Sequence, residues 1–93
     1  MHGVVAQVKI DSGRREEAVK LLNDFAIPTA KGFTGFVSGN WLRSLQGDRG
    51  VSVLLFESED AARAAVERVR QGPPPGAPVT FESADVYEVL AQA

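Results

Sequence analysis

The sequence has 93 residues, no cysteine, a single histidine and a formal net charge of −2. This length predicts one domain, and the lack of cysteine excludes a disulfide framework, a thiolate metal site and a cysteine nucleophile. The slightly acidic balance provides no attraction for a polyanion, which argues against a nucleic-acid partner. No apolar run reaches the roughly 20 residues of a membrane span and no signal peptide begins the chain, so we expect a cytoplasmic protein without a membrane partner.

The first third of the chain predicts a strand followed by a helix. Residues 3–10 alternate in polarity, and one face of this strand would carry Val4, Ala6, Val8 and Ile10. Asp11 or Ser12 would cap the helix that follows. Apolar residues at helical spacing form its stripe: Ala18, Leu21, Leu22 and Phe25. Pro28 predicts a kink or an end nearby, with Gly32 as a late stop.

The middle of the chain predicts a hairpin and a second helix. Residues 36–45 and 51–57 flank the turn residues "QGDRG" and should pair as antiparallel strands. The second strand is apolar on both faces, so the face that helices leave open should meet a partner, a ligand or another layer. Ser58 would cap the helix that follows. Its buried stripe would comprise Ala62, Ala65, Val66 and Val69.

The chain should close with one more strand. The stiff connector "PPPGAP" is typical of a spacer between packed elements. The strand that follows would carry Val79, Phe81, Tyr87 and Val89 on one face. The resulting order βαββαβ, in one domain covering residues 1–93, predicts an α+β ferredoxin-like fold with an antiparallel sheet and two helices on one face.

The stretch "KGFTGFVSG" is similar to the base-stacking octapeptide of RNA-recognition motifs. It enters the second strand rather than the third, however, and the first strand has no companion aromatic. Phe33 and Phe36 are three residues apart, so an extended segment would point them to opposite faces. We therefore predict that Gly32 and Gly35 form a turn while both rings pack. The loop "DSGRR" after the first strand is likewise more typical of a solvated first helical turn than of a phosphate site.

A family resemblance emerges at the hairpin and second helix. The segment "GFVSGNWLRSLQGDRGVSVLLFESEDAARAA" resembles the corresponding part of the antibiotic-biosynthesis-monooxygenase-like group of the dimeric α+β barrel superfamily. The helix start "GRREE" and the closing "VYEV" agree with it, so the resemblance spans nearly the whole chain. It implies a homodimer whose two sheets pack face to face, and a pocket between each protomer's sheet and its helices.

Departures from the family pattern restrict the function. Members often carry a tryptophan two residues before the serine that caps the second helix, where this chain has Phe56. The haem-degrading branch needs an asparagine on the first strand and a histidine on the second helix. Here the first strand offers only Gln7 and that helix has no histidine, which argues against haem degradation. The single histidine, His2, stands at the chain start, where disorder is commoner than ligation, so no metal site is expected.

The resemblance implies cofactor-independent oxygenation of a small aromatic or polyketide-like compound. The candidate ligand-binding residues are Asn40, Trp41, Arg43, Phe56 and Tyr87. Trp41 could stack on a ligand, Asn40 could bond a carbonyl, and Arg43 could hold an oxyanion. Alternation places Trp41 and Arg43 on one face, and Asn40 with Phe36 and Leu42 on the other.

The alternative to an enzyme is a non-catalytic dimer that binds a small apolar ligand or serves as a scaffold. Packing is the commoner role for residues such as Trp41 and Tyr87. An open apolar pocket with converging polar groups would favour the enzyme, whereas a filled interior would favour the scaffold.

Overall fold

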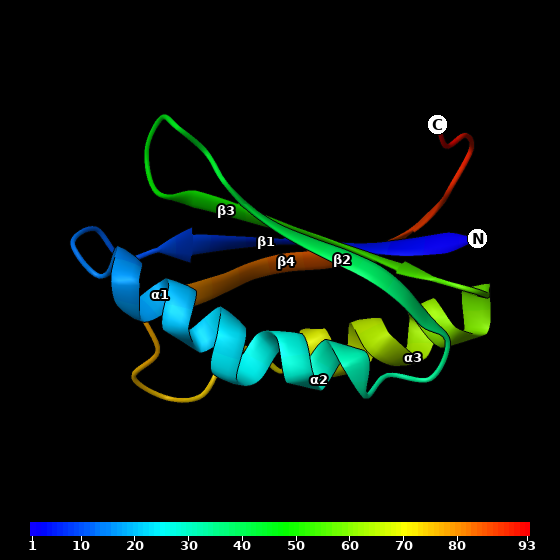
Figure 1. Ribbon diagram of the computed structural model, residues 1–93, viewed down its shortest axis with the longest axis horizontal. Coiled ribbons are helices and arrows are strands. Elements are labelled where there is room, and N and C mark those ends of the chain that lie inside the picture. Colours follow the sequence, from blue (N-terminus) through cyan, green and yellow to red (C-terminus); the bar gives the residue numbers. More distant parts are fainter.

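The computed structural model describes all 93 residues. The elements follow in the order β1 (His2–Ile10), α1 (Arg15–Leu21), η1 (Leu22–Ala26), α2 (Ile27–Lys31), β2 (Phe36–Arg43), β3 (Arg49–Phe56), α3 (Glu59–Val69) and β4 (Val79–Glu88). The four strands form one antiparallel sheet in the order β2-β3-β1-β4. All helices lie on one face of it (Figure 1). The ferredoxin-like fold expected from the sequence is confirmed.

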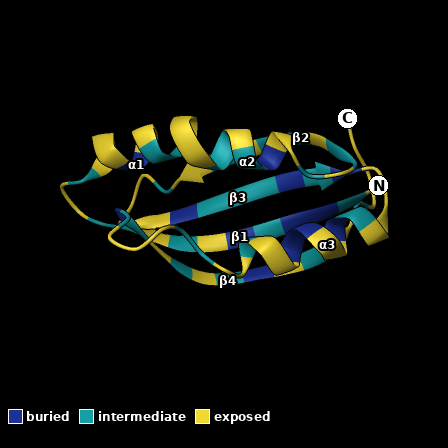
Figure 2. Cartoon of the chain, turned by 90° about the horizontal axis from the view of Figure 1, so that it is seen from below, coloured by how far each residue is buried: buried dark blue, intermediate teal, exposed yellow.

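The first helical segment runs continuously through α1, η1 and α2, with a π-helical turn just before Pro28. Pro28 has no N–H to donate to the carbonyl four residues earlier, and the wider π turn accommodates that loss. Gly32 is the C-terminal cap, as expected. Most of the outer surface of this segment is exposed (Figure 2).

The expected helix cap at Asp11 or Ser12 was wrong, because the N-terminal cap of α1 is Arg14. The backbone N–H of Arg14 bonds to the carbonyl of Asp11, and Gly13 has a φ of 82°. A positive φ at the third position is typical of a type II turn, so a tight turn separates β1 from the helix. The Asp11 carboxylate instead accepts a bond from Arg14 Nη1 at 3.2 Å.

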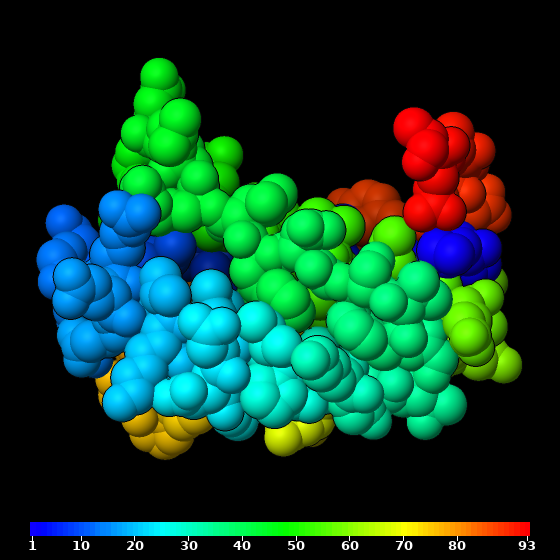
Figure 3. Space-filling model, in the orientation of Figure 1, coloured from blue at the N-terminus to red at the C-terminus, as the bar shows by residue number.

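The face of the sheet opposite the helices is uncovered and carries an apolar patch at its centre. Val5, Val51, Val53 and Leu55 are half-buried and project from it. The tip of the β2–β3 hairpin and the C-terminal residues rise on this side with a hollow between them (Figure 3). Each of these projections carries an exposed leucine, Leu45 at 91% and Leu90 at 87%. The second apolar face of β3 predicted from the sequence is therefore present and has no covering layer.

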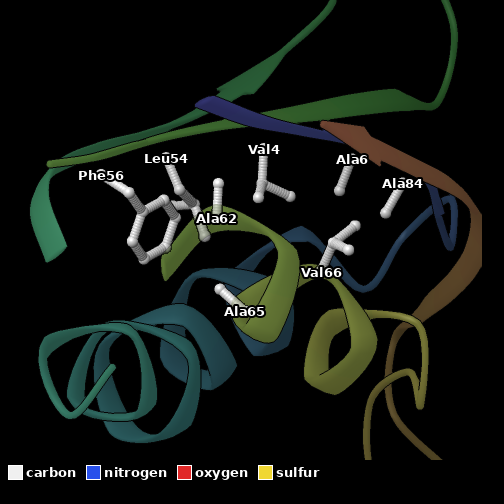
Figure 4. Packing of buried hydrophobic residues seen from close by; sticks show 8 residues of the cluster. All are labelled: Val4, Ala6, Leu54, Phe56, Ala62, Ala65, Val66 and Ala84. Carbon is white, nitrogen blue, oxygen red and sulfur yellow. The ribbon is translucent and has the colours of Figure 1, made fainter. Parts of the chain in front are cut away.

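The compact core lies between the sheet and α3 (Figure 4). It consists of Val4, Ala6, Leu54, Phe56, Ala62, Ala65, Val66 and Ala84. Ser58 caps α3 as expected, because its Oγ accepts a bond from the N–H of Ala61 at 3.1 Å. The alanines along α3 let the helix approach the strands closely. The expected buried stripe of α3 is confirmed, with Val69 packed at its edge.

Two β-bulges change which side chains face the helices. Val37 is an extra residue opposite β3, so Phe36 and Trp41 share the helix-facing side. Glu82 is an extra residue opposite β1 and has the same effect in β4, where Phe81 faces the helices and Tyr87 faces away. An extra residue in one strand reverses the alternation beyond it. The predicted grouping of Phe36 with Asn40 and Leu42, and of Tyr87 with Phe81, was therefore wrong.

Two expectations about single residues have opposite outcomes. Phe33 and Phe36 pack on Phe56, with ring centroids 6.2 and 5.9 Å away, which confirms packing roles for the aromatics of "KGFTGFVSG". His2, expected to be disordered, lies in β1 because it pairs with Phe56 and Glu88.

None of the helices is both long enough and apolar enough to cross a membrane.

Candidate functional site

An apolar cavity of about 300 Å³ lies between the helical segment α1–η1–α2 and the sheet. Its helical wall comprises Ala18, Leu22, Phe25, Ala26 and Ala30, and its sheet wall includes Ala6, Val8, Leu54 and Phe81. The space exists because most of the α1–η1–α2 segment stands away from the sheet, whereas α3 packs directly on β1 and β4. The volume is at the lower end of the range for small-ligand pockets, about 300–1,000 Å³.

The strand register shows which residues lie at each end of the cavity. On β2 the helix-facing residues Arg43, Trp41 and Gly39 follow one another at two-residue steps. Gly50, the partner of Arg43, also pairs with Val8 near the end of β1, just before α1 begins. Arg43 therefore marks the end of the cavity near the β1–α1 turn. Leu54, the partner of Gly39, marks the inner end beside the packed core.

Trp41 forms a fixed aromatic wall along this axis. Its side chain is half-buried and packs against the core. The six-membered ring of the indole lies over Gly39, where a Cβ would come within 2.9 Å of Trp41 Cη2. The glycine thus provides the space that this ring occupies. A planar ligand in the cavity would meet the indole and its single N–H donor.

Two hydroxyl groups join Trp41 in the lining. Ser52 is the β3 partner of both Trp41 and Ala6, and Thr29 comes from α2 on the opposite wall. Neither residue was singled out from the sequence. A signal existed in "VSVLLF", because Ser52 is the one hydroxyl among residues that alternation places with Leu54 and Phe56. Together these groups provide a few polar contacts on a largely apolar surface, which is the usual composition of a ligand site.

Three arginines, Arg15, Arg43 and Arg68, are the charged residues of the lining, and no acidic residue contributes to it. All three are exposed, so their side chains lie at the rim. Arg43 Nη1 donates to the Ser44 carbonyl at 3.2 Å, and Arg68 Nη1 donates to Gln71 Oε1 at 2.9 Å. The cavity therefore combines an apolar interior with a positively charged opening.

Arg14 directly precedes the lining residue Arg15, but its own role is structural. Its guanidinium bonds to Glu17 at 2.8 Å and to Asp11, and it donates to the carbonyl of Gly76 at 3.2 Å. The hydrogen bond from Arg14 lowers the pKa of the Glu17 carboxyl, and the same pair raises the pKa of Arg14. These contacts join the start of α1 to the proline-rich connector, whose Gly72 and Pro73 line the cavity.

The structure separates the five residues predicted from the sequence. Trp41 and Arg43 line the cavity. Asn40 and Tyr87 are exposed on the opposite side of the sheet, with Tyr87 at 53%. Phe56 has 0% exposure and is absent from the lining, although it packs on Phe33, which does line the cavity.

The sequence of this chain matches the model of one protein family. The model of the family described as antibiotic biosynthesis monooxygenase matches residues 1–70. The chain belongs to this family. The matched part of the antibiotic biosynthesis monooxygenase domain runs from β1 through α3 and contains Trp41, Ser52 and all three rim arginines. A comparison with curated protein sequences gives no significant match.

Solved structures with the same fold cover nearly the whole chain. The haem-degrading protein MhuD of Mycobacterium tuberculosis, with two haems bound, superposes with a TM-score of 0.76 at 20% identity, over 100% of this chain and 99% of its own. HapK of Hahella chejuensis gives 0.68 at 14% identity, over 100% and 96%. The ActVA-Orf6 monooxygenase of Streptomyces coelicolor, in complex with nanaomycin D, gives 0.64 at 18% identity, over 99% and 89%. At these identities the likeness establishes the fold alone.

Proposed function

We propose that this protein is a monooxygenase-like enzyme that oxidises a small aromatic or polyketide-like compound in its cavity without a cofactor. The observation that carries the proposal is the open apolar cavity with Trp41, Ser52 and Arg43 along one wall. Family membership supports oxygen chemistry, and ActVA-Orf6 is a monooxygenase with nanaomycin D bound. An open cavity is also what separates this proposal from a filled scaffold.

The reaction that such a site could support begins with a phenol. Loss of the phenolic proton gives an electron-rich anion, which Arg43 and the Trp41 N–H would stabilise. The anion transfers one electron to dioxygen, and the two radicals combine at a ring carbon to form a peroxide. Loss of water from this peroxide gives a quinone. One oxygen atom of O₂ ends in the quinone and the other in water, so the substrate itself supplies all the electrons.

The protein's contribution would be binding and electrostatics more than proton transfer. No aspartate, glutamate or histidine lines the cavity, so the phenolic proton would pass to water at the open rim. The positive charge of Arg43 favours the ionised phenol and lowers its pKa. The apolar walls exclude water from the rings and strengthen this interaction.

Haem does not fit the residues of this cavity. The lining contains no histidine, cysteine, methionine or tyrosine that could ligate an iron. Helix α3 has no histidine, and Gln7 of β1 is exposed on the face away from the cavity. No cluster of histidine, cysteine, aspartate and glutamate suited to a metal ion occurs elsewhere in the structure. We therefore derive no step through haem.

A second candidate function is non-catalytic binding of the same class of compound. The absence of an acid–base residue from the cavity favours it, because a carrier needs an apolar pocket and no proton transfer. The two functions share their ligand and differ only in turnover. A direct assay of oxygen consumption therefore separates them.

The test is oxygen uptake by the purified protein with anthrone or 1-naphthol, corrected for oxidation in buffer alone. We expect saturable formation of the quinone with one O₂ consumed per molecule formed. Arg43→Gln should lower kcat/KM by about tenfold, as expected for loss of one charged hydrogen bond, whereas Arg49→Gln outside the cavity should not. No rate above buffer for either compound would contradict the enzyme and leave the binding function.

The proposal includes a homodimer formed through the open face of the sheet. The half-buried Val5, Val51, Val53 and Leu55 form an apolar surface that nothing covers within one chain. A second copy would fill the hollow between the hairpin tip and the C-terminal residues (Figure 3). Pairing of this kind is also an effective way for a small domain to bury more apolar surface.

A further inference from the structure

We propose that the cavity selects an aromatic carboxylic acid, whose carboxylate binds the rim arginines while its rings lie along Trp41. The aromatic part of this ligand rests on the proposed function. The requirement for an acid rests on a separate observation, the distribution of ion pairs over the molecule. It holds whether the ligand is oxidised or only bound.

The arginines of this chain divide into two groups by their partners. Arg14, Arg63 and Arg70 hold carboxylates of Asp11, Glu17, Glu59, Glu67 and Asp85. The remaining four form no salt bridge: Arg15, Arg43, Arg49 and Arg68. Three of these four line the cavity. Acidic residues outnumber basic ones by 12 to 10 in this chain, so the carboxylates available for pairing are not scarce.

The unpaired arginines converge on one end of the cavity although they come from three elements. Arg15 is the first residue of α1, just beyond the end of β1. Arg43 ends β2 and pairs with Gly50, which also pairs with Val8. Arg68 lies in the last turn of α3, and Gly72 just after that helix lies next to Phe81, the β4 partner of Val8. All three therefore belong to the end of the sheet where β1 passes into α1.

An acid group at this end would be recognised without being fully buried. The arginines are exposed, so a carboxylate at the rim would keep part of its hydration and avoid the cost of an interior charge. A guanidinium can hold a carboxylate by two parallel hydrogen bonds, and the apolar wall behind it strengthens the attraction. From Arg43 the wall continues inward through Trp41 to Gly39, which orients the rings along the indole.

The test compares 1-hydroxy-2-naphthoate with its methyl ester, which has the same rings and no charge. Binding to the full-length protein is measured by isothermal titration calorimetry, with Trp41 fluorescence as a second readout. We expect the acid to bind at least about tenfold more tightly than the ester, as charged hydrogen bonds to arginine predict. Raising the salt concentration should weaken binding of the acid and leave the ester unchanged.

Matched variants assign the effect to the cavity. Arg15→Gln and Arg68→Gln should each weaken binding of the acid by about fivefold or more and leave binding of the ester unchanged. Arg49→Gln removes an equally unpaired arginine outside the cavity and should change neither. Arg15→Lys keeps the charge and should retain part of the affinity. Circular dichroism and thermal unfolding check that every variant is folded.

The outcomes distinguish this inference from the proposed function. Equal affinity for acid and ester, unaffected by the arginine variants, would overturn the inference while leaving an aromatic ligand in the cavity. Tight binding of the acid that depends on the arginines would support it, even if no phenol is oxidised. If neither compound binds, both the inference and the ligand of the proposed function are contradicted.

Discussion

Trp41 depends for its place in the cavity on Gly39, two residues earlier on the same side of β2. The indole can lie over Gly39 because no Cβ occupies that space. Leu54, opposite Gly39 on β3, bounds the same space, so three residues fix the wall on which a ligand would stack. The position of the aromatic wall therefore depends on the missing side chain at Gly39 as much as on Trp41 itself.

Gly39→Ala should displace the indole. The new Cβ would lie 2.9 Å from both Leu54 Cδ2 and Trp41 Cη2, so at least one side chain has to move. We expect the free energy of unfolding to fall by about 1–3 kcal/mol and the emission of Trp41 to shift to longer wavelength. Chemical denaturation followed by tryptophan fluorescence measures both. Gly32→Ala, whose Cβ would have an ordinary contact of 3.4 Å, is the control, and an identical response of the two variants would contradict this account.

Phe56→Ala should act on stability before it acts on a ligand. The ring is fully buried against Phe33 and Phe36 and does not line the cavity. Its removal should lower the free energy of unfolding by about 3–5 kcal/mol, as for other buried aromatic side chains. Urea denaturation gives the loss. A stable variant with much weaker binding of 1-hydroxy-2-naphthoate would show instead that Phe56 contacts the ligand, as the sequence suggested.

The elements differ in how closely they approach one another, and the cavity results from that difference. Helix α3 packs on β1 and β4 through alanines, whereas the α1–η1–α2 segment approaches the sheet chiefly through α2, which lies against β2. The turn into β2 brings Gly35 against α3, and the N–H of Glu57 bonds to the Gly35 carbonyl at 2.9 Å. This contact fixes the start of β2, the strand that carries Trp41 and Arg43.

Gly35→Ala and Gly76→Ala form a matched pair that measures this contact. Both glycines have positive φ, 75° and 79°, so both alanines carry similar backbone strain. At Gly35 the new Cβ would lie 2.8 Å from Ala61 Cβ, whereas at Gly76 nothing lies within 4 Å. We expect the loss of stability at Gly35 to exceed that at Gly76 by about 1–3 kcal/mol in thermal or chemical unfolding. Equal losses would mean that α3 tolerates the added carbon.

The elements could be predicted from the sequence, but the faces of two strands could not. Alternation located β1 and helical spacing located the α3 stripe correctly, because neither element contains an irregularity that shifts its own pattern. Val37 and Glu82, the bulge residues, are ordinary strand residues rather than glycines that would mark a bulge, so the reversal they cause in β2 and β4 is visible only in the register. Trp41 and Arg43 were grouped correctly because both lie beyond the bulge.

The rest of the site depends on which segments come together. Arg15 and Arg68 come from different helices, and nothing in their local sequence indicates that they share an opening with Arg43. Alternation places Ser52 on the helix-facing side, but only the strand register shows that it lies opposite Trp41. Phe56 was chosen by its position relative to Ser58, and that position lies in the packed core rather than in the cavity. Long-range packing decided each of these cases.

The whole molecule has two apolar regions on opposite sides of one sheet, and they have different expected roles. Leu54 is buried beneath the sheet, whereas its neighbour Val53 faces the uncovered side between Val5 and Asn40. The inner region forms the cavity and the core, and the outer region is the surface that a second copy would cover. Adjacent residues of β3 therefore allow the two roles to be separated experimentally.

Leu54→Asp should unfold the chain, because an unpaired carboxylate in the core costs several kcal/mol. Val53→Asp should convert the expected dimer into a folded monomer. In the monomer the new carboxylate is in contact with water, so it does not destabilise the fold. Circular dichroism measures folding and sedimentation velocity at micromolar concentration measures mass. A monomeric unaltered protein would contradict the proposed dimer, and a folded Leu54→Asp variant would contradict the assignment of the core.

The ligand should enter the cavity beneath the sheet rather than bind to the apolar face above it. Methyl-resolved NMR of the protein titrated with 1-hydroxy-2-naphthoate tests this directly. We expect saturable shifts at methyl groups of Val8, Leu22 and Val69, which line the cavity, and little change at Val5, Val53 and Leu55 on the open face. Shifts confined to the open-face methyls, or none at a saturating concentration, would contradict the claim.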